Sequence, residues 1–172
     1  MNIDIVQWCV NISKRFPVIG FVVWMFSYSV IAFLMILVPG YTIFRNGFFV
    51  FVLFIFWILI LLSVWGTGVL LKSIIKRPRP YETGLFTPLF RSGGSSFPSL
   101  HSAFVGAISS GAYILHVPYW QGIVLLSLCV ACSRVFGGVH YVTDIIAGFI
   151  IGGSIAFLIN MSIFPVLSLI TI

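Results

Sequence analysis

A histidine and an aspartate near the end of the sequence have the types and the spacing of a reactive pair. His140 and Asp144 are four positions apart, so a helix that begins near His140 would bring both side chains to one face, within hydrogen-bonding reach. A carboxylate bonded to one imidazole nitrogen fixes the tautomer and makes the other nitrogen a better base or nucleophile. Asp144 is the only acid in the last 90 residues, and a lone carboxylate in an apolar helix is costly without a partner. We expect His140 to be that partner.

Two further residues lie at an expected helix start. Pro98 suits the first turn of a helix, because its missing N–H would be unpaired there anyway. Ser99 and His101 follow it, where free N–H groups and the positive end of the helix dipole attract an anion. The Ser99 hydroxyl can add a donor, and His101 can give a proton to a leaving oxygen. This segment therefore predicts an anion site with an acid beside it.

Basic side chains complete the candidate site. Lys72 and Arg79 flank the expected end of another helix. Arg134 can turn back to the same point because Gly137-Gly138 interrupts the helix after it. Arginine offers forked donors that match phosphate oxygens, whereas lysine supplies a point charge. Two histidines and an aspartate could also suggest a metal, but a zinc site needs three or four ligands and the surrounding cations would repel it. We expect a phosphate and no metal.

The composition indicates that these groups belong to a membrane protein. Hydrophobic residues make up 60% of the 172 and charged residues 7%, whereas a soluble domain has about 25% charged residues. In a soluble protein the net charge of +6 would favour nucleic acid. Here most of the basic residues cluster near the candidate site, which suits an anionic headgroup or a phosphate at a membrane surface. We therefore expect a membrane and a lipid as partners, and no nucleic acid.

A spanning helix needs about 20 mostly apolar residues, and five segments approach or meet this requirement. They are residues 17–38, 48–71, 98–116, 120–135 and 140–160. We expect a loop over 39–47, a longer loop or partial lid over 76–97, and a kink or an end at Pro165. Residues 2–16 predict an interfacial amphipathic helix, with a short sixth span as the alternative. The expected fold is all-α: a polytopic transmembrane bundle of five to six helices, in one domain over residues 1–172.

Helix directions bring the candidate residues to one membrane face. The second and fourth spans run one way, and the third and fifth run the other way. The residues at the ends that meet are Lys72, His101, Arg134 and His140. The neighbouring Lys76 and Arg77 are expected only to extend their charges to the headgroup region.

Three segments resemble the signature of the type 2 phosphatidic acid phosphatase superfamily. Its pattern is Lys, six residues, Arg-Pro; then Pro-Ser-Gly-His; then Ser-Arg, five residues, His, three residues, Asp. The first and third segments match with their spacings intact, and the second has Leu100 where glycine is usual. The signature region covers residues 72–144, and the matching positions are Lys72, Arg79, Pro80, Pro98, Ser99, His101, Ser133, Arg134, His140 and Asp144.

The resemblance implies a role for each residue. His140 would attack phosphorus and form a phosphohistidine, Asp144 would orient and activate it, and His101 would protonate the leaving oxygen and later help water attack. The groups that would hold the phosphoryl oxygens are the side chains of Lys72, Arg79, Ser99 and Arg134 and the backbone N–H groups of Leu100 and His101. No metal or other cofactor would be required, because side-chain cations offset the charge.

The expected function is hydrolysis of the phosphomonoester or pyrophosphate of a membrane lipid. Undecaprenyl pyrophosphate, phosphatidic acid, phosphatidylglycerol phosphate and lipid A 1-phosphate are all candidates. One alternative is a membrane phosphotransferase that uses the same histidine, which Leu100 slightly favours. Another is an anion transporter, which would place polar groups at mid-membrane depth, whereas these spans are apolar through their centres. The sequence leaves the oligomeric state open.

Charge and resemblance disagree about the orientation. Eight of the nine Lys and Arg residues, all except Arg45, are expected on the active-site face, which the positive-inside rule would place in the cytoplasm. At least three of the eight are recruited for phosphate, and the resemblance implies an extracytoplasmic site in bacteria. We therefore expect a multi-pass inner-membrane protein with its site on the periplasmic or extracytoplasmic face.

Overall fold

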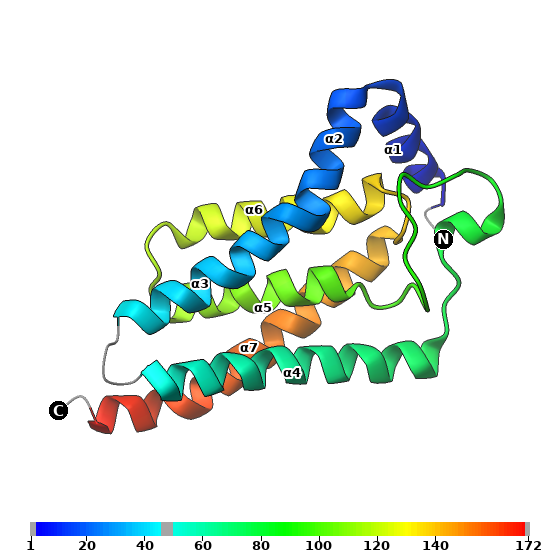
Figure 1. Ribbon diagram of the computed structural model, residues 1–172. Coiled ribbons are helices and arrows are strands. Elements are labelled where there is room, and N and C mark those ends of the chain that lie inside the picture. Colours follow the sequence, from blue (N-terminus) through cyan, green and yellow to red (C-terminus); the bar gives the residue numbers. More distant parts are fainter. Residues whose placement is uncertain (1–2, 46–49, 171–172) are drawn as a thin grey trace.

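The computed structural model describes residues 3–45 and 50–170, most of which are helical (Figure 1). The elements in chain order are α1 (Ile3–Arg15), α2 (Pro17–Met25), a π-helical turn η1 (Phe26–Val30), α3 (Ile31–Arg45), α4 (Val50–Ile75), a 3-10 turn η3 (Pro80–Thr83), α5 (Leu100–Ile114), α6 (Trp120–Phe136) and α7 (Val142–Ile170). No strand occurs in the described part of the chain. The predicted all-α class is confirmed.

The bundle contains helices long enough to span a membrane and shorter helices. Three helical runs are long and apolar enough to cross a membrane, and they cover Pro17–Arg45, Leu53–Thr83 and Val142–Ser162. The other two predicted spans, α5 and α6, are shorter, with 15 and 17 residues. At about 1.5 Å per residue, α5 falls short of a hydrocarbon core of about 30 Å. α5 contacts α3, α4, α6 and α7, so it lies inside the bundle with other helices around it.

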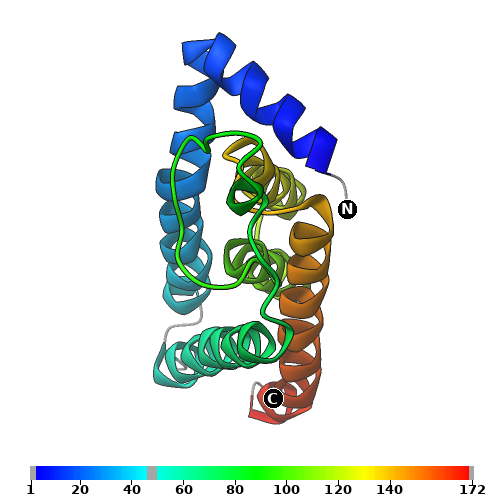
Figure 2. The same ribbon diagram turned by 90° about the vertical axis from the view of Figure 1, so that its right-hand side faces the viewer.

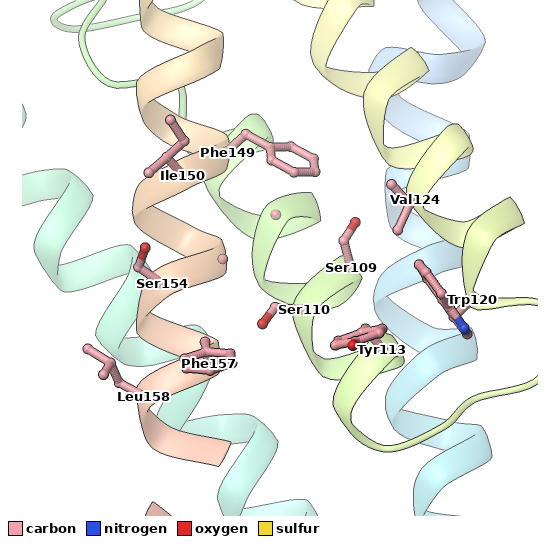
Figure 3. A pocket seen from close by; sticks show the side chains of 12 residues that line it. Ser109, Ser110, Tyr113, Trp120, Val124, Phe149, Ile150, Ser154, Phe157 and Leu158 are labelled. Atoms are coloured by element: carbon pink, nitrogen blue, oxygen red, sulfur yellow. The ribbon is translucent and has the colours of Figure 1, made fainter. Parts of the chain in front are cut away.

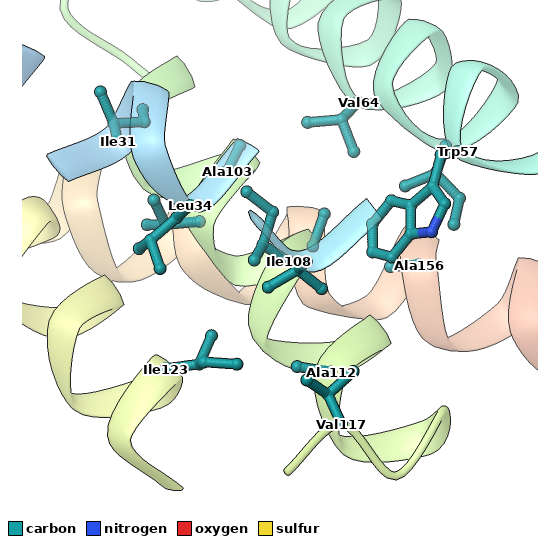
Figure 4. Close-up of a cluster of buried hydrophobic side chains, with 14 of the residues drawn as sticks. Ile31, Leu34, Trp57, Val64, Ala103, Ile108, Ala112, Val117, Ile123 and Ala156 are labelled. Atoms are coloured by element: carbon teal, nitrogen blue, oxygen red, sulfur yellow. The ribbon is translucent and has the colours of Figure 1, made fainter. Parts of the chain in front are cut away.

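Glycines allow α5 and α7 to pack with their backbones in contact. A Cβ added at Gly152 would lie 1.8 Å from the carbonyl oxygen of Ala103, and one at Gly148 would lie 2.4 Å from that of Ser99. Small residues at such contacts are the usual means of close packing between membrane helices. The main apolar core surrounds α5, and Figure 4 shows Ile108 among side chains of the neighbouring helices.

Two prolines lie inside helices, although the sequence predicted a loop from Pro39 and a kink or an end at Pro165. The predicted loop at 39–47 is wrong for residues 39–45, because α3 continues through Pro39 to Arg45; residues 46–47 lie outside the described part. The Thr42 hydroxyl donates to the Pro39 carbonyl (2.8 Å) and accepts from Nε1 of Trp57 on α4 (2.9 Å). These two hydrogen bonds link α3 to α4 beside the proline. Likewise α7 continues past Pro165.

The predicted amphipathic helix at the N-terminus is α1. Val6, Cys9 and Val10 are buried against α6 and the start of α7, where they pack with residues such as Tyr141. Trp8 lies away from this buried face, with 61% of its surface exposed. The apolar stripe of α1 therefore packs on protein, next to the end of the bundle that carries the candidate site.

The ends of four helices meet on one side of the bundle, as the helix directions predict. In Figure 1 the end of α4, the start of α5, the end of α6 and the start of α7 lie at the same end of the molecule. Figure 2 shows the segment between α4 and α5 crossing over this end. α2 and α3 diverge from α4 towards the same side (Figure 1).

Candidate active site

Asp144 is held by three donors. It is fully buried at the third position of α7, and its Oδ2 accepts a hydrogen bond from the Tyr141 backbone N–H (2.9 Å), as the acidic residue of a capping box does. Oδ2 also accepts from the Ser96 hydroxyl (2.5 Å), and Oδ1 pairs with Nη1 of Arg77 (2.6 Å). The carboxylate is therefore fixed in one orientation by three segments of the chain.

His140 lies beside this carboxylate but outside the helix. α7 begins at Val142, close to the expected start near His140, so the imidazole precedes the first turn of the helix. Capping by Asp144 nevertheless brings the imidazole close: Nδ1 lies 3.7 Å from Oδ2 of Asp144 and 3.5 Å from the Ser96 hydroxyl. Burial lowers the pKa of His140 to about 4, although Asp144 acts in the opposite direction. The imidazole is therefore neutral at pH 7, and a proton on Nδ1 leaves a lone pair on Nε2.

Arg79 anchors the loop over the site. It is buried, and its guanidinium donates to three backbone carbonyl oxygens at 2.7–2.9 Å, those of Gly93, Gly94 and Val139. Two longer contacts join Nη1 to Nε2 of His140 (3.4 Å) and Nη2 to the Ser95 carbonyl (3.5 Å). Nζ of Lys72 donates to the same Ser95 carbonyl. A phosphoryl oxygen could most easily replace the two longer contacts.

Arg134 is a buried cation without a full set of partners. It is 1% exposed, and its Nε and Nη1 have no hydrogen-bond partner among the residues that the structure describes. The rings of Phe90 and Tyr28 flank the guanidinium carbon, with centroids at 5.0 and 6.0 Å. Tyr28 belongs to the π-helical turn, which the Ser27–Ser133 hydroxyl pair ties to α6 (2.8 Å). Because buried charges are normally paired, this arrangement favours an anion.

A cavity of about 510 Å³ joins a polar part to an apolar part. Its charged or titratable lining consists of Lys72, Arg79, His101 and His140, and its apolar lining consists of Ile31, Ala32, Met35, Trp65, Leu100 and Phe104. Along α4, Trp65 is about two turns from Lys72, and along α5, Phe104 is about one turn from His101. The cavity therefore extends from the cationic end of the bundle towards its apolar middle, as an amphiphile would require.

The structure gives Ser99 a helix-capping position. Its Oγ accepts from the backbone N–H and the hydroxyl of Ser102 (3.4 and 3.0 Å), and its own N–H donates to the Asp144 carbonyl (3.1 Å). Of the eight predicted site residues, five line the cavity: Lys72, Arg79, Leu100, His101 and His140. Asp144, Arg134 and Ser99 are buried behind this lining.

Two residues of the site were missed by the sequence analysis. The assignment of Arg77 to the headgroup region is wrong, because Arg77 pairs with Asp144, donates to the Thr143 hydroxyl (2.8 Å) and stacks on Tyr141, with 4.3 Å to the ring centroid. Ser96 was placed in the expected loop or partial lid over 76–97 but is fully buried against Asp144. The Asp144 carboxylate could have indicated both residues, because a buried carboxylate needs more hydrogen-bond donors than one neutral imidazole provides.

A larger cavity, of about 680 Å³, lies between α5, α6 and α7 (Figure 3). Its described lining is mainly apolar, with the hydroxyl groups of Ser109, Ser110 and Ser154, and includes none of the predicted site residues. Without a cation or an imidazole in that lining, this cavity has no group that suits phosphate chemistry. Size alone therefore does not identify the candidate site.

The fold and the cavity together define a polytopic membrane protein with a cationic, histidine-bearing site at one end of its helical bundle. The model of the PAP2 superfamily matches residues 51–166, and the chain belongs to this superfamily. This match confirms the resemblance seen in the three sequence segments.

Two relatives and one solved structure show where the similarity lies. Phosphatidylglycerophosphatase B of Bacillus subtilis (strain 168) is 34% identical over 119 residues, which cover 59% of this chain and 56% of that protein. Lipid A 1-phosphatase of Rhizobium etli is 37% identical over 90 residues, which cover 49% of this chain and 39% of that protein. The chain thus spans about half the length of the curated relatives it matches. The crystal structure of a transmembrane PAP2 type phosphatidylglycerolphosphate phosphatase from Bacillus subtilis aligns with a TM-score of 0.61 at 27% identity, over 92% of this chain and 82% of that chain.

Proposed function

We propose that the chain is a lipid phosphatase that hydrolyses the phosphomonoester or pyrophosphate of a membrane lipid through a phosphohistidine intermediate. The observation that best supports this function is the cavity in which a buried histidine of low pKa lies beside Lys72, Arg79 and His101. A neutral imidazole can act as a nucleophile, and the cations can stabilise the negative charge that develops on a phosphoryl group.

In the first step, Nε2 of His140 attacks phosphorus while the bond between phosphorus and the leaving oxygen breaks. The leaving oxygen takes a proton from His101, which lines the same cavity and receives that proton from the phosphate monoanion as the substrate binds. Asp144 stabilises the positive charge on the phosphorylated imidazole, since its Oδ2 lies 3.7 Å from Nδ1. In the second step, water attacks the phosphohistidine, His101 takes a proton from that water, and phosphate and free His140 result.

We further propose that the cations Lys72, Arg79 and Arg134 take the place of a metal ion in this reaction. Arg134 does not line the cavity, but two of its nitrogens have no partner in the described structure, so its positive charge remains available to an anion bound there. Arg79 keeps the loop closed and contributes through its two longer contacts. No cofactor is assigned.

The proposed substrate is an amphiphile whose phosphate binds in the cationic part of the cavity. Its hydrocarbon chain would lie along the apolar lining from α3, α4 and α5. The relatives named above are a phosphatidylglycerophosphatase and a lipid A 1-phosphatase, so the candidates remain within the lipid phosphates and diphosphates expected from the sequence. We propose an inner-membrane location with the cavity on the extracytoplasmic face.

The proposed function is tested by phosphate release from a panel of lipid phosphates. The purified full chain in detergent is expected to release inorganic phosphate from at least one member, with EDTA present and without an acceptor lipid. Release that requires an acceptor lipid would indicate a phosphotransferase. Loss of activity on chelation, restored by a divalent metal, would reject the metal-free mechanism, and no release from any member would reject the function.

Replacing Arg77 with glutamine is expected to lower kcat/KM by roughly 10- to 100-fold, the usual effect of losing a group that orients a catalytic ligand. The variant removes the 2.6 Å ion pair with Asp144, so the carboxylate can rotate away from His140. Lys76→Gln is the matched control, because Lys76 is adjacent and exposed and the substitution removes the same positive charge. Equal activity of the two variants would show that Arg77 does not position Asp144.

His140 is expected to remain neutral at pH 5.5, where an ordinary histidine is mostly protonated. Its pKa of about 4 in the folded protein is below the value of about 6.5 in an unfolded chain. Between these two values the unfolded chain binds a proton that folded His140 does not. The free energy of unfolding therefore has its full value above about pH 6.5 and decreases as the pH falls from 6.5 towards 4. A ¹⁵N-histidine NMR titration of the ligand-free protein, with His140→Asn for assignment, measures this pKa. A midpoint near 6.5 would contradict the assignment.

A further inference from the structure

Leu100 lies where the polar and apolar parts of the active-site cavity meet. It is the first residue of α5, next to His101, and lines the cavity together with Trp65 and Phe104. Of these neighbours in sequence, His101 belongs to the polar part of the lining and Leu100 to the apolar part. The first atoms bonded to a phosphate in the polar part must therefore pass the leucine side chain.

A glycine on α4 makes room for this side chain. A Cβ added at Gly68 would lie 2.3 Å from Cδ2 and 3.4 Å from Cγ of Leu100, whereas one added at Gly66 would meet nothing within 4 Å. The isobutyl group of Leu100 thus rests on the backbone of α4. Gly68 allows the leucine to sit at the edge of the cavity, and any larger residue at position 68 would push it inward.

The lining around Leu100 offers few partners to a polar linker. Its neighbours in the apolar part come from α3, α4 and α5 and are Ile31, Ala32, Met35, Trp65 and Phe104. Of the described residues that line the cavity, only Ser92 carries a hydroxyl, and it belongs to the loop between α4 and α5. An ester carbonyl or a sugar hydroxyl beside Leu100 would lose water without gaining a hydrogen bond, which is unfavourable.

We propose that Leu100, seated on Gly68, is a specificity-determining residue that favours a slender hydrocarbon chain bonded directly to the phosphate or diphosphate, as in prenyl and alkyl phosphates. A phosphate bonded to an esterified glycerol or to a sugar is disfavoured. The inference rests on the proposed phosphatase function. A glycine at position 100 removes the isobutyl group and exposes the backbone, so the passage becomes wider and more polar.

The test compares two phosphomonoesters, one with its phosphate bonded directly to a hydrocarbon chain and one with its phosphate bonded to an esterified glycerol. The probes are farnesyl phosphate and dioctanoyl phosphatidic acid, assayed with the purified full chain in detergent, and the measured quantity is the ratio of their kcat/KM values. The wild type is expected to prefer farnesyl phosphate. Leu100→Gly is expected to lower this ratio about 10-fold or more, the scale on which pocket shape discriminates apolar groups, chiefly by raising kcat/KM for phosphatidic acid.

Variants of α4 test the contact from the other side. Gly68→Ala forces Leu100 towards the cavity and is expected to raise the ratio. Combining Gly68→Ala with Leu100→Gly gives the new methyl group the vacated space, so the ratio should move back towards the wild-type value. Gly66→Ala makes the same change on the same helix without a contact, and it is expected to leave the ratio unchanged.

Three results would overturn the inference: a wild-type preference for phosphatidic acid, a change of less than about twofold in an active Leu100→Gly variant, or equal effects of Gly66→Ala and Gly68→Ala. If Leu100→Gly does not fold, Leu100→Ala provides the same comparison with a better helix former. Failure of the proposed function is a separate outcome, because the wild type would then release phosphate from neither probe.

Discussion

Replacing His140 with asparagine is expected to lower the rate of phosphate release roughly 10⁴-fold or more, as for other enzymes that lose their nucleophile. Asparagine is polar and of similar size, but its amide nitrogen has no lone pair available for bonding to phosphorus. The imidazole is buried in the cavity wall with Nε2 facing Arg79. The change therefore removes the proposed nucleophile while it leaves most of the surrounding contacts in place.

The control for this variant is a histidine at the other end of the bundle. His116 is exposed in the turn between α5 and α6 and has a positive φ of 48°, a conformation that asparagine tolerates well. His116→Asn is expected to keep its activity within about twofold, because surface substitutions rarely matter. Quenching in alkaline SDS, in which a phosphohistidine survives, with a ³²P-labelled substrate should trap label on the wild type and not on His140→Asn. More than a tenth of the wild-type rate in His140→Asn would refute the nucleophile assignment.

The meeting of the candidate residues at one end of the bundle could be predicted because helix direction follows from span order alone. Lys72 lies at the end of one span and His101 at the start of the next. Two such ends lie on the same face of the membrane however the helices pack. Hydropathy also sufficed for the amphipathic α1, since its buried Val6 and Val10 are four residues apart and share a helical face.

The support of the Asp144 carboxylate could not be predicted, because it depends on how an irregular segment folds back. Arg77 and Ser96 are 67 and 48 residues away in sequence, and neither belongs to a helix. A basic residue at a membrane helix end usually extends to the headgroups, so sequence reasoning assigned that role to Arg77. Only the return of the segment between α4 and α5 to the start of α7 makes the ion pair.

The boundaries of the spans were less predictable for a related reason. Proline ends most helices in water because a carbonyl loses its donor, but α3 continues through Pro39. There the hydroxyl of Thr42 and the indole N–H of Trp57 form a side-chain link between α3 and α4. Sequence periodicity does not reveal such a contact between helices.

Replacing Arg134 with methionine is expected to lower activity strongly without lowering the stability of the protein. Methionine has a similar volume and no charge, and replacing buried ionic groups with apolar residues is often neutral or stabilising. Arg134 is 1% exposed, and its Nε and Nη1 lack partners in the described structure. Its charge is therefore costly to the folded, ligand-free protein. The expected results are an equal or higher Tm in detergent and a loss in kcat/KM of roughly 10²- to 10³-fold, the usual effect of removing a transition-state donor.

Ligand binding separates this explanation from a purely structural role for Arg134. If the guanidinium is kept for phosphate, orthovanadate should raise the Tm of the wild type by binding the folded state and should have little effect on Arg134→Met. Arg45→Met is the matched control, because Arg45 is exposed and ends α3 on the opposite side of the bundle, and it should respond to vanadate as the wild type does. A lower Tm for Arg134→Met, together with an unchanged vanadate response, would show that Arg134 supports the fold. An equal Tm with a lost response would mean that the protein retains a destabilising charge because its anion requires it.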